Sequence, residues 1–451
     1  MPQIRKILIA NRGEIALRII RACRDMGIRS VAVYSTADKD SMHVRLADES
    51  VCIGPAPSKE SYLNEAAILT AALLTNADAI HPGYGFLSER AEFVEKVEQH
   101  KLVWIGPTAK MISKMGDKLN ARKTAAECGL PVMPGSDGPV GTLESALEWA
   151  EKIGYPVMLK AAAGGGGKGM RAVFGAKEMP EAFQMTKAEA RAGFGDDTLY
   201  MEKLLSNPRH IEFQVLADQH GGAVIFGERD CSLQRKNQKV MEECPAAALT
   251  QKQRDDMIES CKAAVKKMKY TNAGTLEFMF EDGKFYFLEM NARLQVEHPV
   301  TEMVYGIDLV REQIRIAMGE KLGYSQANIV PNGHAIEFRI NAEDPETFIP
   351  NAGTITQYCP PGGLGVRVDS AAYTGWKIPP TYDSLIAKLI VWAPNRPACI
   401  MRAQRALDEF SIEGVKTTIP LQQRLLQNKD VKQLNVDNKW LEKFLANGKK
   451  S

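Results

Sequence analysis

Hydrophobic positions at the start of the chain follow two different periods in turn. Residues 5–10 (RKILIA) form a short apolar run that is typical of a buried strand, and apolar residues then recur at helical spacing from Ile15 to Met26. Gly27 ends the helical pattern, and SVAVYS at 30–35 reads as a second strand. Because strand, helix and strand in this order open a doubly wound parallel sheet, we predict an N-terminal domain of that class.

Glycine-containing turns follow two of these predicted strands. The turn NRGE at 11–14 has one glycine where a dinucleotide-binding fingerprint needs three, so the pattern does not favour NAD. A further strand at 77–81 runs into the turn HPGYGFLSE at 81–89. Such turns bind ligands in open α/β sheets, although the same residues also form plain tight connections. The sequence leaves both interpretations open for this turn.

The middle of the chain changes from helical to strand patterns. Proline and glycine concentrate at 128–140 (CGLPVMPGSDGPV), which predicts a domain boundary. A strand, a glycine run and a second strand then occupy 155–174, and a helix is expected to about Arg191. From residue 198 strand patterns dominate and predict an antiparallel sheet region. Further strands are expected beyond residue 330, together with helices near 397–410 and 418–427.

Composition excludes several classes of protein. The 451 residues are 45% hydrophobic and 25% charged, as in a soluble globular chain of several domains. The 57 Lys and Arg against 55 Asp and Glu give a net charge of +2, so we expect neither nucleic acid nor a membrane surface as partner. We also expect no secretory signal and no membrane span, since no apolar run reaches about 18 residues.

Cysteine and histidine usage adds two exclusions. The eight cysteines include no CxxC pair, which fits reduced thiols and a cytoplasmic location. The seven histidines show no HExxH spacing, which disfavours a transition-metal enzyme.

The segment KAAAGGGGKGMR at 160–171 is the first candidate for chemistry. A Walker loop needs Ser or Thr after Lys168, where this chain has Gly169, and a Rossmann fingerprint must open a helix, whereas MRAVF reads as a strand. A flexible linker would be flanked by polar sequence rather than by apolar strands. A glycine-rich hairpin that covers phosphates with its N–H groups and a mobile surface hairpin both remain.

The segment EMNARLQVE at 289–297 is the second candidate. Polar residues alternate with apolar ones, so an extended strand over this segment would carry five polar groups on one face. Carboxylates, amides and an arginine suit hard cations and oxyanions better than they suit an ordinary solvent-facing strand. Glu277 lies on the preceding strand and would share a face with Glu289 if the hairpin loop had an odd length, for example three residues through Gly283.

Six motifs in register identify the chain as resembling one family. ILIANRGEIALRIIRAC, HPGYGFLSE, KAAAGGGGKGM, RDCSLQRKNQK, FLEMNARLQVEHPVTE and PPTYDSLIAKLI together are similar to biotin carboxylase, the ATP-grasp component of biotin-dependent carboxylases. The resemblance spans residues 3–445. It implies an α/β and α+β multidomain fold: a doubly wound N-terminal domain (1–116), a linker with the ATP-grasp lid (117–204), the ATP-grasp core (205–330) and an antiparallel, β-rich C-terminal domain (331–447).

The resemblance also implies the reaction and the partners. ATP and bicarbonate give carboxyphosphate, whose CO₂ passes to N1′ of biotin, with Mg²⁺ or Mn²⁺ as the metal. The family's Met-Lys-Met biotin-accepting signature is missing, so we expect a separate biotin carboxyl carrier protein. A carboxyltransferase subunit would select the acceptor, which is acetyl-CoA, as in fatty acid biosynthesis, propionyl-CoA, pyruvate or another 2-oxo acid. The family forms homodimers around GGLGVRV, where this chain keeps Arg367 but has Leu364 in place of a frequent aromatic residue.

By the same resemblance the nucleotide and metal residues are expected at the following positions. ATP would be bound by Lys118, Lys160, Gly165, Gly166, Gly167, Lys168, Met170, Glu202, Lys203, Leu205, His210, Gln234, Asn237, Glu277 and Glu289, with 165–168 forming a mobile lid. The metal ligands would be Glu277, Glu289 and Asn291. Many family members have His where this chain has Asn237, which affects the expected ribose contact.

Bicarbonate and biotin residues follow in the same way. Bicarbonate would be bound by Lys239, Arg293, Gln295 and Val296, and Glu297 would be the general base that deprotonates it. Arg339 would stabilise the biotin enolate, with Tyr84 at the biotin site. The catalytic set is thus Glu297, Arg293, Arg339 and Lys239. The alternatives are another ATP-grasp ligase, or a nucleotide-binding regulatory subunit that has lost its chemistry; the presence of all four residues argues against the second.

Overall fold

The structure is a computed structural model that describes residues 3–163 and 169–448. A five-stranded, fully parallel sheet of order β3-β2-β1-β4-β5 forms the N-terminal domain and confirms the predicted doubly wound arrangement. The buried side of its first helix, which includes Ile15, Ile19 and Cys23, packs on this sheet. The elements are β1 (Lys6–Ile9), α1 (Gly13–Asp25), β2 (Arg29–Ser35), α2 (Met42–Leu46), β3 (Glu49–Gly54), α3 (Glu65–Leu74), β4 (Ala79–His81), α4 (Ala91–Gln99) and β5 (Val103–Trp104), followed by α5 (Ala109–Gly116) and α6 (Lys118–Glu127).

A small three-stranded antiparallel sheet follows, in the order β7-β6-β8. Its elements are α7 (Leu143–Ile153), β6 (Val157–Ala161), β7 (Met170–Val173), α8 (Met179–Phe194) and β8 (Leu199–Lys203). The two strands that flank the glycine run pair with each other, with Lys160 opposite Met170, which confirms the predicted strands on either side. Gly165, Gly166, Gly167 and Lys168 lie outside the described residues.

An eight-stranded antiparallel sheet of order β13-β12-β9-β10-β11-β14-β17-β16 forms the rest of the framework. It runs without interruption across residue 330, because β11 pairs with β14. The strands are β9 (Arg209–Ala217), β10 (Ala223–Arg235), β11 (Gln238–Cys244), β12 (Asn272–Glu281), β13 (Lys284–Asn291), β14 (His334–Asn341), β16 (Val366–Ser370) and β17 (Leu385–Ala393). The remaining elements are α9 (Gln251–Met268), α10 (His298–Tyr305), α11 (Leu309–Ala317), β15 (Gln357–Cys359), α12 (Arg396–Glu409), β18 (Ser411–Glu413), α13 (Ile419–Gln427), α14 (Lys429–Lys432) and α15 (Trp440–Gly448).

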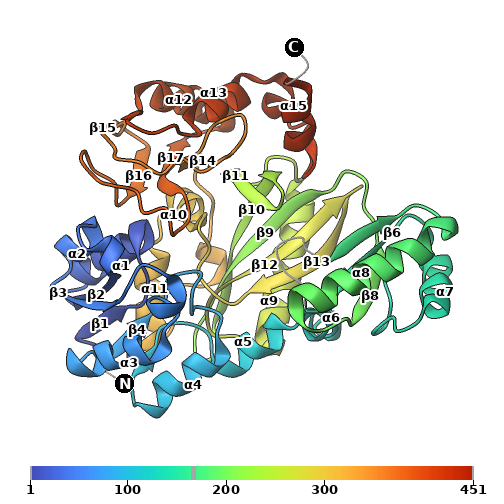
Figure 1. The fold of residues 1–451 in the computed structure, drawn as a ribbon, viewed down its shortest axis with the longest axis horizontal. Helices are drawn as coiled ribbons and strands as arrows, with labels where there is room; N and C mark the ends of the chain where they lie inside the picture. The colour runs from blue at the N-terminus through green and yellow to red at the C-terminus, as the bar shows by residue number, and fades with distance from the viewer. Residues whose placement is uncertain (1–2, 164–168, 449–451) are drawn as a thin grey trace.

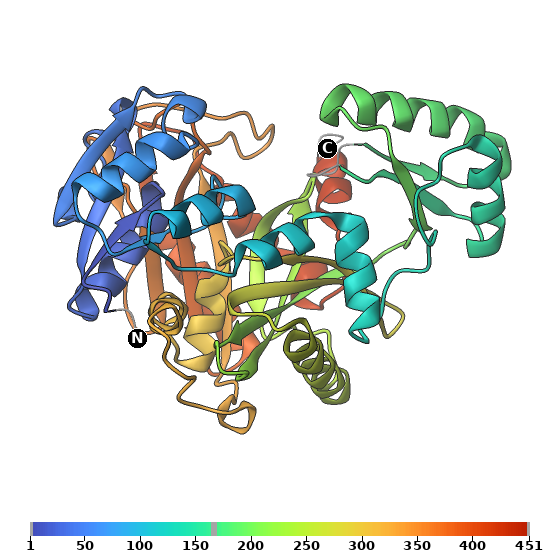
Figure 2. The same ribbon diagram turned by 90° about the horizontal axis from the view of Figure 1, so that it is seen from below.

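The large sheet lies between the other two parts. Figure 1 shows the N-terminal sheet and the C-terminal helices α12 and α13 towards one end of the molecule, and the layer of β6, α7 and α8 at the other. Figure 2 shows the same separation from below. Two large buried clusters hold the halves of the sheet, one around Phe213 and Phe278 and the other around Phe338 and Leu389. The site is therefore framed by three sheets.

The structure corrects two expectations in the strand-rich region. Residues 251–268 form the helix α9, whose buried Met257, Cys261, Val265 and Met268 recur at helical spacing that the sequence analysis did not use. The region from 198 onward is also not one sheet, since β8 belongs to the small one.

The predicted strand over 289–297 is likewise shorter than expected. β13 ends at Asn291, and the chain then turns through residues 292–297 into α10, so the five polar residues do not share one strand face. Proline at position 299 lies in the first turn of this helix, where its missing N–H costs nothing. The polar groups still converge, because the turn folds Gln295 and Glu297 back into the same interior.

The β12–β13 hairpin differs from the expected odd-length loop. Its loop has two residues, Asp282 and Gly283, both with positive φ, as in a type I′ turn. Such a loop alone would place Glu277 and Glu289 out of register. A β-bulge after Glu277 adds one residue, Leu288, to β13, and Glu277 then faces Glu289 directly. The bulge brings about the pairing that the sequence analysis assigned to the loop.

Candidate active site

One cavity of about 1020 Å³ brings together every predicted site residue that the structure describes. It lies where the small sheet, the large sheet and the N-terminal domain meet. The predicted residues that line it are Tyr84, Lys118, Lys160, Met170, Glu202, Lys203, Leu205, His210, Gln234, Asn237, Lys239, Glu277, Glu289, Asn291, Arg293, Gln295, Val296, Glu297 and Arg339. Residues that are up to 255 positions apart in the chain (339 − 84) therefore share one chamber.

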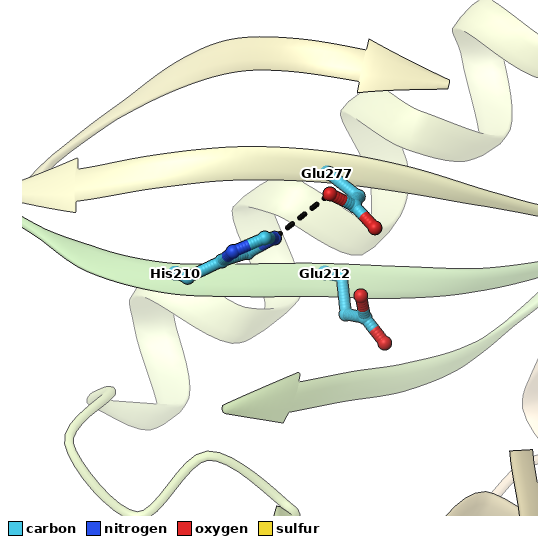
Figure 3. A group of neighbouring side chains, drawn as sticks. All are labelled: His210, Glu212 and Glu277. Carbon is cyan, nitrogen blue, oxygen red and sulfur yellow. Dashed lines mark hydrogen bonds and ion pairs between the residues drawn. The ribbon is translucent and has the colours of Figure 1, made fainter. Parts of the chain in front are cut away.

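Glu277 is the most heavily hydrogen-bonded carboxylate of the cavity. His210 on β9 contacts its Oε2 at 2.9 Å, as Figure 3 shows, while the side-chain amides of Gln295 and Asn291 donate to Oε1 at 2.7 and 2.9 Å. The ammonium of Lys239 also donates to Glu277 Oε1, at 3.1 Å. Burial alone would raise the pKa of Glu277, but Lys239 and His210 lower it below its ordinary value. Glu277 is therefore an ionised, fixed acceptor.

Glu289, which faces Glu277 across the hairpin, has no ion pair with any residue in the described parts of the chain. Burial and the repulsion of Glu277 raise the pKa of Glu289. A divalent cation would relieve both effects, and two carboxylates with the amide oxygen of Asn291 are ligands that Mg²⁺ accepts. The residues present thus fit a hard cation. His210, Glu212 and Glu277 form a second group of possible metal ligands (Figure 3), in which Lys239 bridges the two carboxylates.

Glu297 lies fully buried between two cations. Its Oε1 accepts from Lys239 Nζ at 2.5 Å and its Oε2 from Arg339 Nη2 at 3.0 Å. Burial would raise the pKa of Glu297, whereas Lys239 and Arg339 lower it below its ordinary value. This balance was open from the sequence, and the geometry favours an ionised carboxylate, which can accept a proton from a bound acid.

Arg293 connects the bicarbonate set to the metal set. Its Nη1 donates to Gln295 Oε1 and its Nη2 to Asn291 Oδ1, both at 2.9 Å. Glu89, at the end of the HPGYGFLSE motif, accepts from Arg293 Nε at 2.8 Å and from the backbone N–H of Ala292 at 3.0 Å. The N-terminal domain thereby fixes the turn that follows β13.

The opposite wall carries the predicted nucleotide residues. Lys160 on β6 is paired with Glu202 on the neighbouring strand β8. Burial and the neighbouring Lys160 lower the pKa of Lys118. Lys203 donates its ammonium to the carbonyls of Gly154 and Tyr155 at 2.8 and 2.9 Å, so its side chain is used within the protein. Asn237 occupies the second position of the two-residue β10–β11 turn with a φ of 62°, which asparagine tolerates well.

Tyr84 is presented by the glycine turn after β4. Asn11 donates to the carbonyls of Pro82 and Tyr84 at 2.7 and 2.8 Å, and a side chain at Gly83 would meet Asn11 and Ile15 at 3.0 Å. The Tyr84 hydroxyl donates to Glu14 at the start of α1. The turn is therefore clamped rather than free, and it is a wall of the cavity.

Several supporting residues were missed by the sequence analysis. Glu212 holds Lys239 at 2.6 Å, and Glu242 holds Arg339 at 2.6 Å. The fully buried Arg229 orients Glu212 from behind at 2.5 Å. Glu212 lies two residues from His210 on β9, a strand whose alternation of polar residues could have identified it.

Comparison with known proteins agrees with this arrangement. The description "Biotin carboxylase, N-terminal domain" matches residues 3–112, "Carbamoyl-phosphate synthase L chain, ATP binding domain" matches 117–325, and "Biotin carboxylase C-terminal domain" matches 337–443. A biotin carboxylase of Haemophilus influenzae is 54% identical over 98% of this chain and 99% of its own.

Solved structures are similarly close. The biotin carboxylase–β,γ-ATP complex of Campylobacter jejuni has a TM-score of 0.95 at 49% identity, covering 98% of this chain and 99% of that one. The biotin carboxylase domain dimer of Hydrogenobacter thermophilus 2-oxoglutarate carboxylase, in complex with MgADP, ADP and bicarbonate, has a TM-score of 0.93 at 48% identity and covers 98% of each chain. With domain models, whole-chain identity and the fold in agreement, this chain belongs to the biotin carboxylase family.

Proposed function

We propose that this chain uses ATP and bicarbonate to carboxylate biotin attached to a separate carrier protein. The single observation that carries the proposal is the position of Glu297, buried between Lys239 and Arg339 in the same cavity as Glu277 and Glu289. A base, a cationic anion site and a pair of acidic metal ligands are what bicarbonate activation by phosphoryl transfer needs.

The residues of the cavity divide into two groups, one for bicarbonate and biotin and one for the nucleotide and the metal. Glu297 takes the proton of bicarbonate, while Lys239, Arg293, Gln295 and the backbone at Val296 hold its oxygens. A bicarbonate oxygen attacks the γ-phosphorus of ATP, ADP leaves, and the carboxyphosphate breaks into CO₂ and phosphate. The phosphate takes the N1′ proton of biotin, the enolate that forms is stabilised by Arg339 beside Tyr84, and N1′ bonds to CO₂. Positioning and charge neutralisation are the protein's main contributions.

The nucleotide residues occupy the other wall. Lys118 and Lys160 would meet the phosphates, which requires Lys160 to exchange Glu202 for ATP. The adenine and ribose sites would be formed by Met170, Glu202, Lys203, Leu205, His210, Gln234 and Asn237. Glu277, Glu289 and Asn291 would hold Mg²⁺ or Mn²⁺, which neutralises phosphate charge when bound.

The division into regions 1–116, 117–204, 205–330 and 331–447 is also proposed, and the ranges of the family matches support it. We infer a carrier protein and a carboxyltransferase as partners, and a homodimer, which the dimer named for the Hydrogenobacter domain supports. Leu364, 82% exposed, leads into β16 and suits such a contact.

In the described residues no helix combines the length and apolar character needed to cross a bilayer. Eight free cysteines support the cytoplasm as the compartment.

The test is ATP hydrolysis by the purified chain with and without bicarbonate and free biotin. The proposal predicts turnover that requires bicarbonate and rises with biotin, with ¹⁴C from bicarbonate appearing in carboxybiotin. Hydrolysis that is indifferent to both compounds would refute it and favour another ATP-grasp ligase.

A further inference from the structure

A fully buried lysine lies directly behind the turn that carries Val296 and Glu297. Lys388, at the centre of β17, donates its ammonium to the carbonyl oxygen of Val296 at 2.9 Å and to Glu14 Oε1 at 3.0 Å. Its Nζ also lies 5.8 Å from the centre of the Tyr84 ring. Lys388 is not among the functional residues assigned above. Lysines are rarely fully buried unless they are paired.

The backbone of the turn is tied from the inside at two successive carbonyls. The Gln295 carbonyl accepts from His298 Nδ1 at 2.8 Å, and the next carbonyl, that of Val296, accepts from Lys388. Both donors belong to fully buried side chains. Because burial and the nearby cations lower the pKa of His298, its ring is neutral and Nδ1 carries the hydrogen.

The two ties fix the direction of the neighbouring N–H groups. In a planar trans peptide the N–H points away from the carbonyl of the same peptide unit. The N–H groups of Val296 and Glu297 therefore point away from His298 and Lys388, on the side where both residues line the cavity. Neither donates a hydrogen bond within residues 3–163 and 169–448. Two successive inward N–H groups form a nest that suits an oxyanion.

The Lys388 ammonium also connects this nest to the turn that carries Tyr84, the residue proposed for the biotin site. Glu14, which accepts from Lys388, also accepts from the hydroxyl of Tyr84. Glu14 lies in the first turn of α1 in the N-terminal domain, whereas Lys388 belongs to β17 of the large sheet. One buried charge thus ties the turn at 296–297 to the clamped turn that presents Tyr84.

We propose that Lys388 is a positioning residue that aims the N–H groups of Val296 and Glu297 at the bicarbonate oxygens and, through Glu14, keeps that turn in register with Tyr84. The proposal rests on the function proposed above. It adds to the bicarbonate site a residue that does not line the cavity and that acts through the backbone of the turn. Removing the ammonium frees the Val296 carbonyl, so the peptide can rotate and the nest is lost. The nucleotide wall, which Lys388 does not touch, keeps its geometry.

The test is steady-state kinetics of Lys388→Met with bicarbonate and ATP varied separately. We expect the bicarbonate KM to rise about tenfold or more, as for the loss of one charge-assisted hydrogen bond, while the ATP KM stays within about twofold. Lys388→Arg, which keeps a charged donor, should recover most of the bicarbonate affinity. A folded Lys388→Met enzyme with an unchanged bicarbonate KM, or with equal losses for both substrates, would overturn the proposal.

A matched control separates positioning from stability. Arg254→Met removes the cation from another buried carboxylate, Glu228, which does not line the cavity. It should lower the thermal midpoint without changing the bicarbonate KM; a similar KM increase there would count against Lys388. If Lys388→Met folds poorly, Lys388→Met/Glu14→Gln, which removes the charge of Glu14 together with its cation, carries the same test. Wild-type protein without bicarbonate-dependent turnover would refute the proposed function instead.

Discussion

Glu297→Gln isolates the proton-accepting role of Glu297 with the smallest change in shape. The amide has the size of the carboxyl group, and its oxygen can still accept from one of the two flanking cations. Neither cation is left alone, because Lys239 keeps Glu212 at 2.6 Å and Arg339 keeps Glu242 at 2.6 Å. The site should therefore retain its architecture while losing a base.

The contacts set the expected magnitudes. The variant loses one charge-assisted hydrogen bond, at 2.5 or 3.0 Å, which is worth about 1.5–3 kcal/mol. Since both cations keep a second carboxylate, the loss of stability should lie at or below that range. General base catalysis contributes about 10²–10⁴-fold, so bicarbonate-dependent kcat should fall by that factor. Nucleotide affinity should change little, because Lys118, Lys160 and Glu289 do not contact Glu297.

Three measurements on one preparation make the test decisive. Urea unfolding gives the stability, fluorescence titration with ATP gives nucleotide affinity, and release of ADP gives turnover. A variant that retains bicarbonate-dependent turnover within about tenfold of wild type would refute the role of Glu297 as base. Loss of ATP binding together with turnover would instead show that the two halves of the cavity are not separable in the way described.

Three further predictions use other parts of the site and core. Arg339→Ala should keep ATP binding but lower biotin carboxylation about 100-fold or more, and equal losses of both would contradict its assignment to biotin. Arg229→Met leaves the buried Glu212 without its main cation and should cost about 3–5 kcal/mol in urea unfolding; a cost below about 1 kcal/mol would show that Lys239 alone satisfies Glu212. Burial lowers the pKa of His43 to about 4 from 6.5, so the unfolded chain takes up the proton first and stability falls as pH drops from 6.5 towards 4. His43→Leu should flatten that pH dependence in unfolding titrations, and an unchanged slope would contradict it.

Much of the framework follows from local sequence patterns. The alternation of apolar strands and a helical repeat at 5–35 predicted the parallel N-terminal sheet, and the apolar strands around the glycine run predicted the β6–β7 hairpin. These features depend on neighbours within a few residues, where side-chain period and backbone preference act directly. The helix α9 was equally readable but was overlooked.

The cavity's residues were expected from the resemblance, but their mutual contacts were not. Spacing alone could not align Glu277 with Glu289, because the parity of a hairpin changes with a single bulged residue, here Leu288. Nor did the alternation at 289–297 reveal that the strand stops at Asn291 and that a turn carries Glu297 inward.

By itself the sequence determined the elements, the types of group available and the family that the motifs resemble. The tertiary structure alone decided which polar groups meet: Lys239 with Glu212 and Glu297, Arg339 with Glu242, and Lys388 with the carbonyl oxygen of Val296. The physical reason is that electrostatic contacts act through space over a few ångströms, and burial decides their strength. Residues separated by up to 97 positions, as Arg339 and Glu242 are, acquire that proximity only when the sheets assemble.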